Sequence, residues 1–244
     1  MKEKRKKQTF LEWLNDQIDL KEILSWLTFT GFIYGPLDRR LEIKEALQKM
    51  LKKPVPKHVN HWFCFGGITF LLFMIQVITG TLLAIYYKPT AHDAYASVQH
   101  IMNDVTLGWL IRQIHAWGAN LMILTLIIHM LRVFFYGAYK HPRELNWTIG
   151  VLLLLLTLTF GFTGYLLPWD QLAYWATTVG TELIGSFPLV GQYILIILRG
   201  GTDVTEVTLN RFYAVHVIIL PWVTAGLMAL HFIMVRRQGI SGPL

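Results

Sequence analysis

The sequence predicts an all-α integral membrane protein, built as a bundle of four transmembrane helices. Of its 244 residues, 54% are hydrophobic and only 15% are charged, and it contains one cysteine. The mean hydropathy is +0.43. This balance excludes a disordered chain, a disulfide scaffold and an ordinary soluble enzyme. Four apolar runs each approach the roughly 20 residues that a helix needs to cross the hydrocarbon core of a bilayer.

Two regions follow from this pattern, an N-terminal region over residues 1–57 and a membrane domain over residues 58–244. In the first, Phe10, Leu14 and Ile18 recur at helical spacing among acidic residues. We therefore expect an amphipathic helix that lies on the membrane surface. In the second, the expected spans cover about residues 61–87, 108–136, 147–167 and 211–235.

Basic residues gather at one side of the expected spans. Residues 1–60 hold 13 of the 22 Lys and Arg residues. Lys140 and Arg143 follow the second span, and Arg236 and Arg237 follow the fourth. Because basic loops remain on the cytoplasmic side, we expect a multi-pass protein of the cell membrane with both termini in the cytoplasm. The net charge of +7 then reflects membrane orientation, and we expect no nucleic-acid partner.

Histidines inside the spans are the first candidates for function, because ionisable side chains are costly in a membrane. The second span carries His115 and His129, and the fourth carries His216 and His231. Intervals of 14 and 15 residues return each pair to nearly one helix face, about 21 Å apart. Both spans run from outside to inside, so we expect His115 to face His216 in the outer leaflet and His129 to face His231 in the inner. Two imidazoles can bind both axial positions of a haem iron, so this haem-binding bundle is expected to hold two b haems.

Glycines in the other two spans repeat the 14-residue interval. Gly66 and Gly80 lie in the first span, and Gly150 and Gly164 lie in the third. These spans run from inside to outside, which puts Gly66 and Gly150 in the inner layer and the other two in the outer. Glycine allows close approach to the backbone, so we expect these four to contact the haem edges. Helix packing alone is the simpler explanation for either pair.

Arginines accompany the four histidines toward the nearer membrane face. Arg112 and Arg211 lie on the outer side, and Arg132 and Arg236 lie on the inner side. Haem propionates need cationic partners at these depths, so the four are propionate candidates. Each could instead extend to lipid headgroups.

Several strings resemble the cytochrome b subunit of quinol-oxidising cytochrome bc complexes. They are His115-Ala116-Trp117-Gly118, residues 140–145, residues 161–170 and residues 237–244. The resemblance is greatest to the short, split form, which is the cytochrome b6 type, and within it to the menaquinol:cytochrome c reductases of Gram-positive bacteria. Ala116 departs from the photosynthetic form, which has an arginine there.

This resemblance implies an electron-transfer subunit that passes electrons from an outer quinol site through two b haems to an inner quinone site, coupled to proton translocation. It implies three partners, namely subunit IV, a Rieske iron-sulfur protein and a membrane-bound c-type cytochrome, in a dimeric complex surrounded by lipid. Menaquinol is the expected substrate. The outer quinol site would be shared with other subunits, so no catalytic residue is assigned and the chain is not expected to act alone.

Cys64 acquires a role only through the resemblance. In similar subunits a cysteine in this context carries a c-type haem through a single thioether, beside the inner b haem. Alone, a cysteine at the start of an apolar helix is usually a packing residue.

Two alternative functions remain open on the residues alone. One is the dihaem anchor of a quinone-linked hydrogenase or formate dehydrogenase. The other is a channel or transporter in which histidines relay protons.

Overall fold

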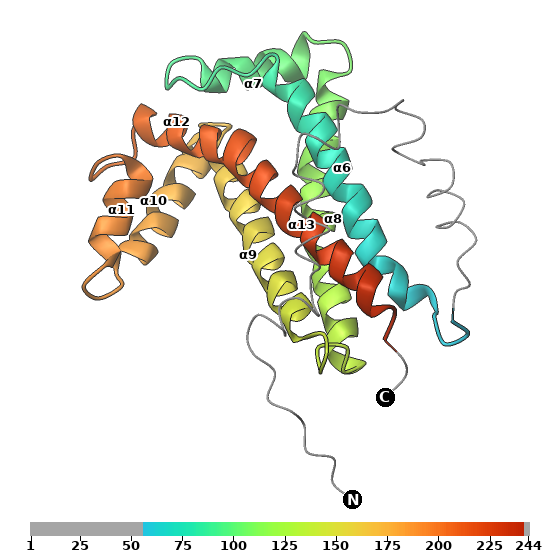
Figure 1. Ribbon diagram of the computed structural model, residues 1–244. Coiled ribbons are helices and arrows are strands. Elements are labelled where there is room, and N and C mark those ends of the chain that lie inside the picture. Colours follow the sequence, from blue (N-terminus) through green and yellow to red (C-terminus); the bar gives the residue numbers. More distant parts are fainter. Residues whose placement is uncertain (1–55, 242–244) are drawn as a thin grey trace, which may run out of the picture.

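The computed structural model describes residues 56–241 (Figure 1). The surface helix expected within residues 1–57 lies almost wholly outside this range. Within it the chain is helical and contains no strand. Four helices of the described part are long and apolar enough to cross a membrane, which confirms the predicted all-α class with four spans.

Each span is one long helix or a continuous series of helical segments. The first joins the short helix η1 (His61–Cys64) to α6 (Phe65–Ala84). The second is α8 (Gly108–Phe135), and the third is α9 (Glu144–Leu166). The fourth runs through α12 (Glu206–Ala214), the π turn η2 (Val215–Ile219) and α13 (Leu220–Gln238). It therefore begins five residues before the expected span, because Thr205 and Thr208 form a capping box that starts the helix there.

Three short helices lie outside the four spans, namely α7 (Ala94–Asn103), α10 (Gln171–Gly185) and α11 (Gly191–Arg199). The helices α10 and α11 lie side by side, and α7 lies apart from them, beside α8 (Figure 1). Asp170 caps α10 by accepting a hydrogen bond from the backbone N–H of Ala173 at 2.8 Å. Gly200, with φ of 83°, ends α11 in the left-handed conformation that glycine adopts without strain.

A buried arginine joins α10 to α11. Arg199 is 4% exposed. Its Nε donates to Oγ1 of Thr181 at 2.7 Å, and its Nη2 donates to the carbonyl of Thr178 at 2.8 Å. Glu182 lies 3.6 Å from the same guanidinium. These bonds compensate for burying the charge and hold the two short helices as a hairpin.

The four spans pack as two pairs, α6 along α8 and α9 along α13. Small buried clusters close the two ends of the bundle. The outer cluster contains Leu166, Leu209 and Phe212, and the inner one contains Ile149 and Met234. Between these clusters the histidines of α8 face those of the fourth span.

Candidate functional site

The outer layer of the bundle brings two histidines together. His115 lies on α8, and His216 lies in the π turn. Their ring centres are 6.4 Å apart, and the ring planes are inclined by 70°. Two metal–nitrogen bonds of about 2 Å on opposite sides of one iron would separate the ring centres by roughly 6 to 6.5 Å. The outer pair therefore has the spacing that a shared haem iron requires.

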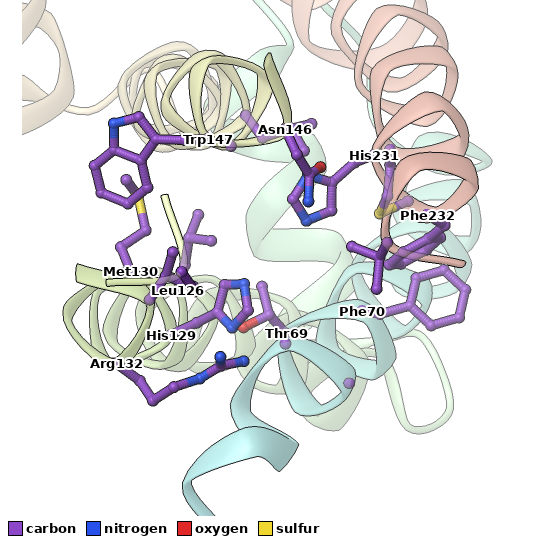
Figure 2. Close-up of a pocket in the computed structure, with 18 of the residues that line it drawn as sticks. Thr69, Phe70, Leu126, His129, Met130, Arg132, Asn146, Trp147, His231 and Phe232 are labelled. Atoms are coloured by element: carbon purple, nitrogen blue, oxygen red, sulfur yellow. The ribbon is translucent and has the colours of Figure 1, made fainter. Parts of the chain in front are cut away.

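The inner layer has the second pair. His129 of α8 and His231 of α13 project from opposite sides into one cavity of about 310 Å³ (Figure 2). Its walls are mostly apolar and include Phe70, Leu126 and Met130. A volume of this size lies within the range of small-molecule and cofactor sites, and the two imidazoles supply its opposed donors.

Both outer imidazoles lie against a glycine of a neighbouring helix. A β-carbon built on Gly80 would lie 3.1 Å from Cε1 of His115. One built on Gly164 would lie 2.7 Å from Cε1 of His216. Carbon atoms pack at about 3.5 to 4.0 Å, so any larger residue would displace the ring at either position.

The inner glycines occupy the equivalent places. A β-carbon on Gly66 would lie 2.9 Å from Cε1 of His129, whereas one on Gly150 would lie 3.8 Å from Cε1 of His231. The layer assignment of all four glycines thus agrees with the imidazole pairing. Each glycine lies nearest to an imidazole ring, and the expected contact with a haem edge stays a prediction.

A π turn explains how a 15-residue interval keeps His216 and His231 on one face. A π turn contains one residue more than the corresponding α-helical turn and so absorbs one residue without rotating the rest of the helix. It ends two residues before Pro221, whose missing N–H removes an α-helical hydrogen bond. The interval of 15 residues then has the same effect as the 14 residues between His115 and His129.

Two threonines contact the outer imidazoles, and sequence reasoning missed both. Oγ1 of Thr79 lies 2.9 Å from Nδ1 of His115, and Oγ1 of Thr163 lies 3.0 Å from Nδ1 of His216. Each threonine directly precedes one of the outer glycines. The repeated Thr-Gly pair, 84 residues apart in the sequence, was the signal that could have found them.

The inner cavity contains buried polar atoms that make no hydrogen bond within the described part of the chain. They belong to seven cavity-lining residues, namely Nδ1 of His129, Nε of Arg132, Nε of Arg143, Oδ1 of Asn146, Oγ1 of Thr224, Nδ1 of His231 and Oγ of Ser241. Arg143 was not among the expected propionate partners, although it belongs to a string that carried the family resemblance. Buried donors and acceptors of this kind need a polar partner, and carboxylate groups of a bound cofactor would satisfy the two arginines.

The four expected propionate arginines have different surroundings. Arg132 lines the inner cavity, with its guanidinium 4.2 Å from the centre of the Phe63 ring. Arg112 donates to the sulfur of Met102 at 3.7 Å, and Arg211 donates to the carbonyl of Ile197. Arg236 is exposed and does not line the cavity. Among the four, the cavity therefore receives Arg132 alone.

Cys64 ends the short helix η1 at the inner end of the first span. Its side chain is exposed, and it lies two residues before the cavity-lining Gly66. Residues 56–241 contain no group of three or more His, Cys, Asp or Glu residues that could hold a metal ion. The candidate metal sites of this region are thus the two imidazole pairs, which suit an iron whose other four ligands come from a macrocycle.

Comparison with known proteins agrees with this arrangement. A protein-family model described as cytochrome b/b6/petB matches residues 50–239. The cytochrome b6 of Rippkaea orientalis is 50% identical over 212 residues, which cover 87% of this chain and 96% of the relative. The cytochrome b6 of Synechococcus elongatus is also 50% identical and is covered over 99% of its length.

This chain is also similar to a chain of a solved structure. A chain from a structure entitled "Hyperthermophilic respiratory Complex III" is 37% identical, with a TM-score of 0.79. The match covers 85% of this chain and 55% of that chain, so the present protein spans about half the length of the solved relative. On the family match and the two cytochrome b6 relatives, this chain belongs to the cytochrome b/b6 family.

Proposed function

We propose that the chain is the transmembrane electron-transfer subunit of a quinol:cytochrome c reductase of the bc type. His115 and His216 ligate the iron of an outer b haem, and His129 and His231 ligate that of an inner b haem. The observation that supports this most strongly is the pairing of four imidazoles in two layers of one bundle. Membership of the cytochrome b family, which implies b haems, supports it independently.

The chain's own residues would hold the cofactors and keep water away from them. Glycines opposite the imidazoles let the rings lie between closely packed helices. Arg132 and Arg143 supply positive charge at the inner cavity, where carboxylates would bind. The 14-residue interval on α8 separates His115 from His129 by about 21 Å along the helix. When bound, the haems supply one-electron redox centres at these two depths of the bilayer.

Quinol oxidation belongs to the outer end and quinone reduction to the inner end in this proposal. The outer site is shared with subunit IV and the Rieske protein, a membrane-bound c-type cytochrome accepts electrons, and the complex is dimeric. The likeness to cytochrome b6 proteins favours the separate subunit IV. Menaquinol is the proposed substrate, because several strings of the sequence resemble the reductases of Gram-positive bacteria. The exposed thiol of Cys64, at the inner end of the first span, carries a c-type haem through one thioether.

Spectroscopy of the purified complex tests these assignments. The pyridine haemochrome spectrum should give two b haems, and a haem stain of a denaturing gel should mark this chain. His115→Ala should remove the outer b haem, and His129→Ala should remove the inner one. Cys64→Ala should abolish the gel-resistant stain and leave the b haems bound.

The same substitution at His100 provides the control. His100 lies on the short helix α7, where it contacts Asp104 at 2.9 Å, outside both imidazole pairs. His100→Ala should retain all haem. A parent protein without b haem would refute the proposal and would favour the proton-relaying channel or transporter. Retention of both b haems in His115→Ala would refute the ligand assignment.

A further inference from the structure

The two outer imidazoles have the same hydrogen-bond partner in the same geometry. Thr79 lies on α6 and Thr163 on α9, and both are buried. Their hydroxyl oxygens lie 2.9 and 3.0 Å from Nδ1 of His115 and His216, respectively. The two helices belong to different pairs of the bundle, so the arrangement arises twice in the chain.

Each threonine hydroxyl has a single proton, and it donates that proton to a backbone carbonyl of its own helix. Oγ1 of Thr79 donates to the carbonyl of Ile75 at 2.6 Å, and Oγ1 of Thr163 donates to the carbonyl of Thr159 at 2.8 Å. A hydroxyl that donates to a carbonyl can still accept through its lone pairs. The imidazole must therefore be the donor, which puts its proton on Nδ1 and leaves the lone pair of Nε2 free.

The inner imidazoles lack this partner. Phe65 and Ile149, which carry no hydroxyl, occupy the positions before the inner glycines. Nδ1 of His129 and Nδ1 of His231 are buried without a hydrogen-bonded hydroxyl in the described region. The two layers thus share glycines and opposed imidazoles and differ in the hydroxyls.

We propose that Thr79 and Thr163 are positioning residues that fix the orientation and tautomer of His115 and His216 and strengthen them as iron ligands. This rests on the proposed function, in which both histidines ligate the outer haem. A hydrogen bond from Nδ1–H makes a metal-bound imidazole a better electron donor. Greater donation favours ferric over ferrous iron, so these hydroxyls lower the reduction potential of the outer haem and leave the inner haem unaffected.

Redox titration of the intact complex, with each haem followed optically, tests the proposal. Thr79→Val and Thr163→Val keep the shape of the side chain and remove the hydroxyl. Each should shift the midpoint potential of the outer haem upward, and the double variant should shift it further. The low-spin ferric EPR signal of the outer haem should also change, because the imidazole planes lose their restraint.

Matched threonines on the same helices serve as controls. Thr81 and Thr159 are exposed, and each donates to a carbonyl four residues earlier, without an imidazole contact in the described residues. Thr81→Val and Thr159→Val should leave both haem potentials unchanged. Thr79→Ser and Thr163→Ser retain the hydroxyl and should keep the parent potential and EPR signal.

The outcomes separate this inference from the function on which it rests. Outer-haem potentials in the valine variants that equal those of the two controls would overturn it, even with both haems bound. Loss of the outer haem in the valine variants but not in the serine variants would support it. Loss in the serine variants as well would overturn it, because a retained hydroxyl would then fail to keep the haem bound. A parent complex without b haem would refute both.

Discussion

The contact between each imidazole and its glycine differs in tightness from one position to another. The built β-carbon at Gly164 would approach His216 to 2.7 Å, whereas the one at Gly150 would lie 3.8 Å from His231. The second distance is an ordinary van der Waals contact, and the first is shorter than carbon atoms allow. Of these two positions, only Gly164 therefore requires glycine on steric grounds.

This difference predicts opposite results for one substitution. Gly164→Ala should force His216 out of position, at a cost of about 1–3 kcal/mol, and remove most of the outer haem. Gly150→Ala should keep the inner haem, because the methyl group fits. Gly226→Ala is the control, since nothing lies within 4 Å of a β-carbon built there. The haemochrome spectrum of each purified variant measures both haems. Equal occupancy in Gly164→Ala and Gly226→Ala would contradict the steric argument.

At the residue scale, the sequence predicted which histidines and glycines share a layer, but it did not predict the hydrogen bonds of individual side chains. Intervals of 14 or 15 residues and the direction of the helices were enough to predict that His115 lies opposite His216 and that Gly80 shares their layer. Intervals carry no information about rotamers or about backbone carbonyls from distant segments. Arg211 is an example, because its guanidinium donates to the backbone carbonyl of Ile197 on α11.

At the scale of elements, the fourth span contains a π turn and still presents His216 and His231 on one face. A straight α-helix would rotate His231 by about 60° from His216 over 15 residues. The π turn Val215–Ile219 absorbs the additional residue, and His216 itself lies within it. We infer that the turn is the means by which the fourth span keeps both imidazoles directed at α8.

Removal of one residue from the π turn should therefore be tolerated. Deletion of Ile218, an exposed residue of the turn, leaves a 14-residue interval that a regular α-helix can accommodate. We expect both b haems to remain bound. Deletion of Ile127, an exposed isoleucine of the regular helix α8, should remove one haem, because a shift of about 100° separates the faces of His115 and His129. Haem content per complex is the measurement, and loss of haem in the Ile218 deletion alone would contradict this account.

The four spans were predictable because each is a long apolar run, and membrane helices must satisfy their backbone hydrogen bonds internally. Hydropathy does not report where such a helix begins. Glu206 starts the fourth span because a capping box formed by Thr205 and Thr208 precedes the apolar run. Hydropathy does not report the π turn either. We attribute the turn to Pro221, which lacks the N–H for an α-helical hydrogen bond, and this does not change the composition of the apolar run.

At the scale of the whole molecule, the bundle has two chemically different ends. The inner end carries Lys140, Arg143, Arg236 and Arg237, beside the cavity that receives His129. The outer end carries the short helices α7, α10 and α11, with acidic residues in their loops. Because basic loops are retained on the cytoplasmic side, this asymmetry predicts that the inner cavity faces the cytoplasm.

Cysteine labelling tests this orientation directly. Asp203 lies in the exposed loop after α11, and Arg237 lies in the last turn of α13. We expect a membrane-impermeant maleimide to modify Asp203→Cys in right-side-out vesicles and Arg237→Cys only in inverted vesicles. Peptide mass spectrometry separates either site from Cys64, and detergent-solubilised protein, in which both sites react, is the control for reactivity. Labelling of Arg237→Cys from the outside would reverse the proposed topology. It would also put the histidine pair His129 and His231 at the side proposed for quinol oxidation, so the direction of electron flow depends on this result.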